Sequence, residues 1–181
     1  MRVGYLDIET DYVGPHKDQK LFEDYGNHKI TVLGVRILDG AKDEFAQLVE
    51  EEVTRQKLLE VLRGVQKIVT YNGRSLPDNV KGRVGFDFPV IAAQLGVVLD
   101  KEFPHRDLVP ECWGRGWYGG QKKVEERLGL KRKLPGKDGA WATDAWREYK
   151  KTGDRKCLEE LLLYNREDIF MLREIEAKLE K

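Results

Sequence analysis

The sequence predicts an α/β fold on a five-stranded mixed sheet, with a three-strand antiparallel meander, two parallel strands and helices on both faces. Three apolar segments follow one another at the start of the chain, and the Asp39-Gly40 pair after the second is a hairpin signal. Beyond residue 52, segments with helical spacing alternate with short strand-like segments. A meander followed by such alternation is typical of a mixed sheet with helices packed on it.

Each element follows from a local pattern. Apolar and β-branched runs predict strands at residues 2–8, 30–38, 44–49, 67–71 and 106–110. Helical spacing of apolar residues predicts helices at 52–63, 87–95, 120–129, 140–151 and 154–180. Asp87 and Asp154 are of the type that caps a helix N-terminus. Two stretches rich in Gly, Asp and Lys, 11–29 and 73–85, are expected to be insertions within one domain.

Length and charge narrow the class of protein. A chain of 181 residues corresponds to one domain, which we expect to span residues 1–181. Lys plus Arg and Asp plus Glu are 32 each, which excludes a strongly basic nucleic-acid coat but not a local basic patch. The sequence has no run of 18 apolar residues. Acids occur early in the chain, where a signal peptide would be apolar. The two cysteines have neither metal-site nor disulfide spacing. We therefore expect a cytoplasmic protein without membrane contact.

Two acids, Asp7 and Glu9, stand at the end of the first predicted strand. Residues i and i+2 of a strand share a face, so these two acids point one way while Leu6 and Ile8 point the other. Two unpaired carboxylates buried side by side cost on the order of several kcal/mol. Mg²⁺ or Mn²⁺ would relieve that cost, because hard cations take oxygen ligands. A strand end with two solvated acids also explains the pattern.

Further acids lie beside apolar segments. Asp87 stands between two phenylalanines at the start of a predicted helix, where a capping role also explains it. On the last helix, Asp168 lies at the edge of the apolar stripe, Asn165 lies within it, and Tyr164 shares a face with Asp168. An acid and an amide facing the core need a partner, which a closed polar network would also supply.

Together these acids favour a common site. Four carboxylates lie on three core elements, in an order that allows them to converge on one cleft. A two-metal site needs acids that hold two cations roughly 4 Å apart, one to activate water and one to stabilise the leaving oxygen.

Three segments resemble, in order, the three motifs of the DEDD 3′–5′ exonucleases of the ribonuclease H-like superfamily: YLDIET, YNG followed by GFDFPVI, and LLLYNREDIFML. QKKVEERLGLKRK and DAWREYKKTGDRKC are similar to the predicted-exonuclease branch of that superfamily. The resemblance covers nearly the whole chain. It implies a ribonuclease H-like fold and hydrolysis of phosphodiester bonds at single-stranded DNA or RNA 3′ ends, with two Mg²⁺ or Mn²⁺ ions.

The resemblance also assigns roles to residues. It implies four metal ligands, Asp7, Glu9, Asp87 and Asp168. Tyr164 matches the tyrosine that positions the attacking water in the Tyr subtype, whereas the His subtype would have histidine at Leu163. Thr10 matches the position that borders the terminal nucleotide, and Asn72 matches the asparagine near the substrate strand.

One departure lies in the second motif. Thirteen residues, 74–86, separate Gly73 from Asp87, more than in the compact form of this motif. Asp78 lies within that insertion and is an alternative ligand; we prefer Asp87 because its aromatic flanks and the following helix match the family. The insertions bear on substrate choice, because DNA and RNA are distinguished by contacts to the 2′-hydroxyl.

The segment 122–137 is a basic window on a neutral chain. It sets seven cations against Glu125 and Glu126, a local net charge of +5: Lys122, Lys123, Arg127, Lys131, Arg132, Lys133 and Lys137. Such a window is typical of a phosphate-binding rim, and a solvated helix face explains it equally well. Lys122 and Lys123 are the predicted contacts.

Aromatic residues gather in the same third of the chain. Trp113, Trp117 and Tyr118, in a Gly-rich segment, are candidates for stacking on unpaired bases. Trp146, on a predicted helix, is expected in the core.

Three alternatives stay open from the sequence. A ribonuclease H-like endonuclease on hybrids or branched DNA would use the same acids. A non-catalytic nucleic-acid-binding module is disfavoured because all four acids and Tyr164 are present. A domain working beside a polymerase or helicase would require that partner in trans, since no polymerase segment is on this chain.

Overall fold

The computed structural model describes residues 1–15, 23–74 and 85–181. Its strands form one sheet in the order β3-β2-β1-β4-β5. The strands are β1 (Val3–Tyr12), β2 (His28–Asp39), β3 (Lys42–Val49), β4 (Lys67–Thr70) and β5 (His105–Asp107). β1, β2 and β3 pair antiparallel, whereas β4 is parallel to both β1 and β5. The predicted meander with two parallel strands is confirmed.

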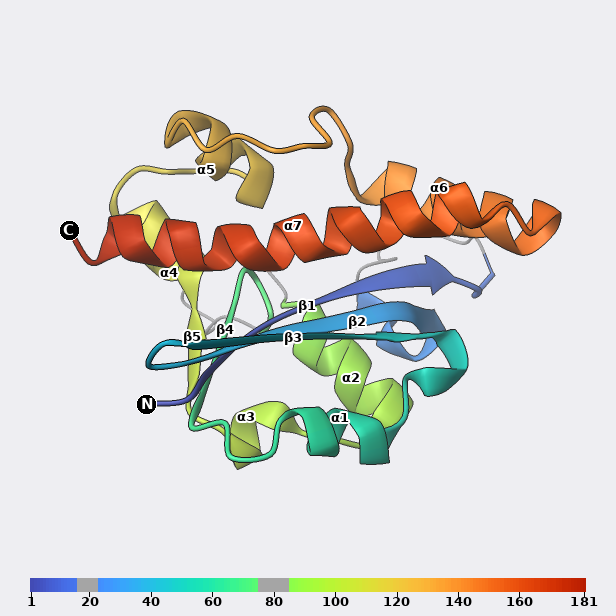
Figure 1. Ribbon diagram of the computed structural model, residues 1–181, viewed down its shortest axis with the longest axis horizontal. Helices are drawn as coiled ribbons and strands as arrows, with labels where there is room; N and C mark the ends of the chain where they lie inside the picture. The colour runs from blue at the N-terminus through green and yellow to red at the C-terminus, as the bar shows by residue number, and fades with distance from the viewer. Residues whose placement is uncertain (16–22, 75–84) are drawn as a thin grey trace.

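Helices cover both faces of this sheet, as predicted. Figure 1 shows α1, α2 and α3 on one face and α4, α6 and α7 on the other, with α5 outside α7. The helices are α1 (Arg55–Val61), α2 (Asp87–Leu95), α3 (Leu99–Glu102), α4 (Leu108–Gly114), α5 (Gln121–Arg127), α6 (Gly139–Thr152) and α7 (Arg155–Leu179). The described residues also form two 3-10 turns, η2 (Tyr25–Asn27) and η3 (Glu50–Glu52). Within the described ranges, none of the helices has the length and apolar character that crossing a membrane requires.

Alternation along β1 sorts its side chains between the two faces. Leu6 and Ile8 pack in the core cluster formed with α1, α2 and α3. Tyr5 packs in the cluster under α7. Asp7 and Glu9 have the same parity as Tyr5 and therefore lie on the α7 side, on one face as predicted.

The first strand is longer than predicted. β1 continues to Tyr12, which pairs with His28 of β2, so Asp7 and Glu9 lie inside the strand and not at its end. The pairing register shifts between Glu9 and Thr10. Such a bulge bends and twists a strand and re-aims the neighbouring side chains. The polar residues that suggested a loop are accommodated here because the strand passes from the core towards solvent.

A second correction concerns residues 106–110. The strand ends at Asp107, whose carboxylate accepts a hydrogen bond from the Val109 N–H at 3.0 Å and so begins α4. Pro110 is tolerated because the N–H groups of a first helical turn have no partner within the helix. The apolar residues that resembled a strand are thus the first turn of a helix, and α3 was not predicted.

The two predicted caps have different outcomes. Asp154 caps α7 by accepting from the Lys156 N–H at 2.9 Å, as predicted. Asp87 is not a cap: Phe86 occupies the capping position of α2, and no side-chain capping bond is present. The core position of Trp146 is confirmed. Residues 16–22 and 75–84, and with them the alternative ligand Asp78, lie outside the described residues.

Gly34 sets how closely α7 approaches the sheet. It lies in β2 directly opposite Asp7. A Cβ atom at this position would lie 2.3 Å from both Asn165 Oδ1 and Ile169 Cδ1 of α7. Only glycine therefore allows α7 to bring its side chains this close to the middle of β1.

We expect Gly34→Ala to lower the free energy of unfolding by about 1–3 kcal/mol, the usual cost of overpacking. Urea denaturation measures this change. Gly26→Ala is the control, because nothing lies within 4 Å of a Cβ at that position. Equal stability of Gly34→Ala and wild type would contradict the close approach of α7.

Candidate acidic metal site

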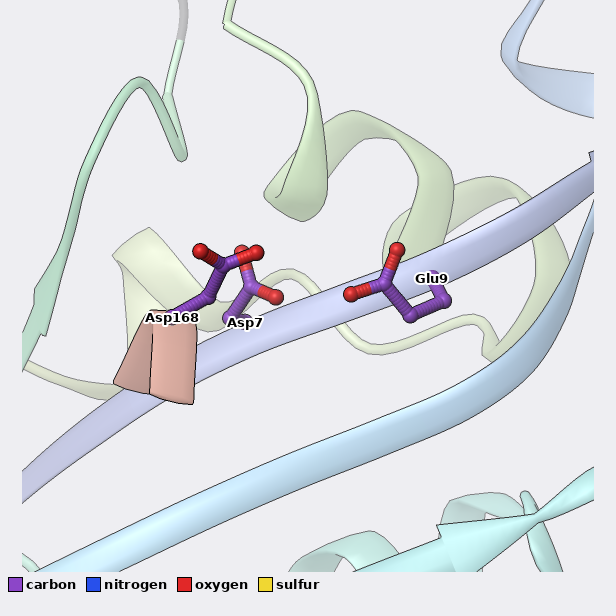
Figure 2. Close-up of side chains that lie close together, drawn as sticks. All are labelled: Asp7, Glu9 and Asp168. Carbon is purple, nitrogen blue, oxygen red and sulfur yellow. The ribbon is translucent and has the colours of Figure 1, made fainter. Parts of the chain in front are cut away.

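The structure brings together three of the four predicted ligands. Asp7 and Glu9 of β1 and Asp168 of α7 each offer a carboxylate oxygen, and these oxygens lie within 4.8 Å of one another. Figure 2 shows the carboxylates of Asp7 and Asp168 beside each other, with Glu9 further along the strand. Glu9 and Asp168 are buried, and Asp7 is partly buried.

The fourth predicted ligand, Asp87, lies nearby but outside this group. It is buried as the first residue of α2. Burial raises its pKa well above the ordinary range, and the charges of Asp7, Asp107 and Asp168 raise it further. Asp87 therefore shares the electrostatic environment of the three grouped acids without meeting them directly.

Asp7 is oriented by a chain of amides. Asn165 Nδ2 donates to Asp7 Oδ2 at 3.0 Å, and Gln47 Nε2 of β3 donates to Asn165 Oδ1 at 2.9 Å. The buried amide predicted on the core-facing side of α7 thus has its partners. This chain of amides fixes the Asp7 carboxylate relative to α7.

Asp168 is held by two cations. Arg132 Nη2 forms an ion pair with Asp168 Oδ1. Lys122 Nζ of α5 lies 3.4 Å from both carboxylate oxygens. Arg132 is itself bound by Glu125, with Nε to Oε2 at 2.5 Å and Nη2 to Oε1 at 2.6 Å.

Tyr164 lies one helical turn before Asp168 and is buried. Lys122 Nζ donates to its hydroxyl oxygen at 2.6 Å and lies 4.4 Å from its ring centroid. Trp141 of α6 packs against the ring at 5.5 Å between centroids. Burial raises the pKa of Tyr164, and so do the charges of the neighbouring acids, so the phenol keeps its proton at neutral pH.

The donor set suits a hard divalent cation. Burial is the largest cause that raises the pKa of Asp7 and of Glu9 well above the ordinary range, and the neighbouring carboxylates add to it. Among the described residues, Glu9 Oε1 and Asp87 Oδ2 are buried without a hydrogen-bond partner. Buried carboxylate oxygens without donors are costly, and Mg²⁺ or Mn²⁺ would satisfy them. The residues therefore fit a divalent metal.

A pocket opens beside Glu9. Its volume is about 460 Å³, and β1, β2 and the start of α6 contribute to its lining. Thr10, predicted to border the terminal nucleotide, lies in this lining, and its hydroxyl is hydrogen-bonded to His28 Nδ1 at 3.2 Å. The pocket gives a ligand access to one side of the acidic group.

Asn72, the predicted strand contact, has a backbone role in the structure. It adopts a left-handed conformation with φ 68°. Its N–H donates to Asp107 Oδ1 at 2.8 Å, and its carbonyl accepts from the Phe86 N–H at 2.8 Å. Asn72 thereby joins the two described ends of the 73–85 insertion and helps to place Asp87.

The other predicted substrate contacts are spread over α4, α5 and the turn between them. Trp113 on α4 is half-buried, and its ring lies 6.3 Å from that of Tyr118. Trp117 packs partly against the core under α7. Lys122 points into the acidic group, whereas Lys123 beside it is exposed. Stacking by the tryptophans stays a prediction.

Sequence reasoning missed the special positions of Arg132 and Glu125. Both were counted with the basic window, but the Arg132 side chain is 8% exposed and that of Glu125 2%. The signal available in the sequence was that Glu125 directly follows the apolar Val124 in a predicted helix. The structure buries both residues. Asp107 was also missed; it caps α4 and binds the Asn72 N–H.

The raised pKa of Asp7 predicts how stability depends on pH. Without metal, the unfolded chain ionises Asp7 near pH 4, while the folded protein resists ionisation until the raised pKa is passed. The folded state therefore loses stability as pH rises through this window, by about 1.4 kcal/mol for each unit of pKa difference.

Asp7→Asn removes this cost, so in EDTA we expect it to stabilise the protein more at pH 8 than at pH 4.5. Urea unfolding at the two pH values measures the difference. Asp100→Asn, which changes an exposed acid, is the control. A stability gain of Asp7→Asn that is the same at both pH values would refute the assignment.

Comparison with known proteins identifies the family. A family model described as RNase_H superfamily matches residues 4–180 of the chain. A search of curated proteins gave no match. The match agrees with the mixed five-stranded sheet and with the acids of β1 and α7. The chain therefore belongs to the RNase H superfamily, which supports a nuclease-type function on nucleic acid and a divalent-metal requirement.

Proposed function

We propose that this protein is a 3′–5′ exonuclease of the DEDD type, Tyr subtype, which hydrolyses phosphodiester bonds at single-stranded nucleic-acid ends with two Mg²⁺ or Mn²⁺ ions. The observation that carries the proposal is the placement of Tyr164. Its hydroxyl is bound to Lys122, which also lies against Asp168, so the phenol stands beside the acidic group. An acidic group alone fits many nucleases, whereas the added tyrosine favours this subtype.

Metal ions bound by Asp7, Glu9, Asp168 and Asp87 would lower the pKa of a water molecule and neutralise charge on the phosphate. Asn165 keeps Asp7 turned towards the group. Tyr164 keeps its proton, and because its oxygen accepts from Lys122, its hydrogen is left to orient a water or a phosphate oxygen. Lys122, 30% exposed at its side chain, adds a positive charge at the rim.

The substrate end has a place to enter. The pocket lined by Glu9 and Thr10 is bordered by Phe86, His28 and Tyr12, and its volume accommodates one nucleoside. Aromatic rings can stack on unpaired bases without strict sequence choice. A single-stranded 3′ end placed here would bring its last phosphodiester bond next to the acids of β1.

Incubation with single-stranded DNA and RNA, labelled at either end, tests the activity. We expect Mn²⁺ to support a ladder that shortens from the 3′ end, EDTA to abolish it, and Asp7→Ala and Asp168→Ala to remove it, because each substitution deletes a ligand. Asp100→Ala serves as the control. Internal cuts would favour an endonuclease, and binding without cleavage would favour a non-catalytic module; either result would overturn the proposal.

Tyr164→Phe tests the subtype. The substitution keeps the ring that packs on Trp141 but deletes the hydroxyl, so we expect kcat to fall on the order of 100-fold through lost orientation, with little change in KM. Tyr149→Phe, on α6, is the matched control. An unchanged kcat in Tyr164→Phe would remove the tyrosine from the mechanism.

A further inference from the structure

Arg132 is a buried cation beside the acidic group. Its side chain is 8% exposed, and it lies on the loop between α5 and α6, a place where arginine is ordinarily solvated. Its guanidinium contacts two carboxylates, Glu125 and Asp168. Burying an arginine between two buried acids costs desolvation free energy, so such a cluster points to a role other than stability.

The loop that carries Arg132 is fastened to α7 twice. The N–H groups of Lys133 and Leu134 donate to Glu167, at 2.5 and 3.0 Å. Glu167 immediately precedes Asp168, so backbone and side chain of the loop bind adjacent residues of one helix. Arg132 is therefore fixed relative to Asp168 by more than its own ion pair.

Glu125 fixes the guanidinium from the other side. It is 2% exposed, and it receives both Nε and Nη2 of Arg132, the paired geometry that sets arginine apart from lysine. Gln121 Nε2 donates to Glu125 Oε1 at 2.9 Å and also to the Asp168 carbonyl at 2.8 Å. α5 and α7 are thus joined around Arg132.

Lys122 differs from Arg132 in every one of these respects. Its side chain is 30% exposed, and its contacts with Asp168 are 3.4 Å long. Among the described residues, no acid other than Asp168 forms an ion pair with it. The shortest contact of Lys122 is with the Tyr164 hydroxyl, at 2.6 Å, and not with an acid. Arg132, by contrast, forms ion pairs with both Glu125 and Asp168.

We propose that Arg132, locked by Glu125, is a positioning residue that sets the orientation in which Asp168 receives a divalent cation. One oxygen of Asp168 is taken by the guanidinium, which turns the rest of the carboxylate towards Asp7 and Glu9. The proposal rests on the metal site of the proposed function, but it concerns metal binding and not the reaction. The opposite role, a cation that competes with metal for Asp168, would require Arg132 to give up its paired contact with the buried Glu125.

Arg132→Lys is the sharpest test, because it preserves charge and removes only the forked geometry. We expect the affinity for Mn²⁺ alone, measured by calorimetry, to fall about 10- to 100-fold, as when other groups that orient a metal ligand are changed. The electron paramagnetic resonance spectrum of bound Mn²⁺ should change as well, which a merely structural role would not produce. Lys131→Arg, exposed on the same loop and also charge-preserving, should leave both unchanged.

A second variant guards against misfolding. Glu125→Gln combined with Arg132→Gln removes both buried charges together, so neither is left unpaired. Urea denaturation establishes that it folds, and the same loss of Mn²⁺ affinity is expected. Unchanged or tighter Mn²⁺ binding by the folded variants, or no Mn²⁺ binding by wild type, would overturn the inference. Arg132-dependent Mn²⁺ binding without exonuclease activity would sink the proposed function and leave the inference standing.

Discussion

Repulsion among buried carboxylates is the constraint on which this structure depends. Asp7, Glu9, Asp87 and Asp168 come from three elements, and burial raises the pKa of each. Without a ligand, the folded state would have a lower free energy if these carboxylates lay apart or in contact with water. Here the packing does the opposite: α7 lies across β1, and glycine at position 34 removes the side chain that would hold the helix away. The metal-free folded state is therefore destabilised at the place where a cation can bind.

Two buried acids of α7 differ in how far their partners offset the effect of burial on the pKa. Glu176, nearer the C-terminus, is as buried as Asp168. Burial would raise its pKa, but a hydrogen bond from Tyr5 at 2.5 Å, together with Lys67 and Arg106, lowers it below the ordinary value. At Asp168, burial prevails over Lys122 and Arg132, and the pKa stays raised. The same helix therefore carries one acid whose burial is outweighed by its partners and another whose burial is not.

How much the sequence could predict follows from the range of the interactions involved. The meander with two parallel strands rests on the succession of strand-like and helical segments along the chain, and the shared face of Asp7 and Glu9 rests on strand periodicity. Both are local properties and were predictable. Residues 108–110 were assigned to the fifth strand because they form an apolar run that looks extended, whereas the hydrogen bond from the Val109 N–H to Asp107 begins a helix there. Asp87 was taken for a cap because capping and ligand positions both favour aspartate at a helix start. The side-chain partners of Asp168 were out of reach, because they depend on how the loop after α5 folds back over α7.

The basic window illustrates the same limit and changes how its charge should be understood. Counted along the chain, 122–137 is a patch of uniform cations, but the structure divides it into two populations. Arg132 is neutralised by Glu125 inside the protein, and Lys122 is bound to Tyr164 and Asp168. The cations that remain outward are fewer but face only one exposed acid, Glu126, so the surface keeps its positive character. We therefore propose that two kinds of residue in this segment, distinguished by burial and not by charge, have different roles. The exposed cations attract phosphate, and the buried Arg132 orients the acidic group.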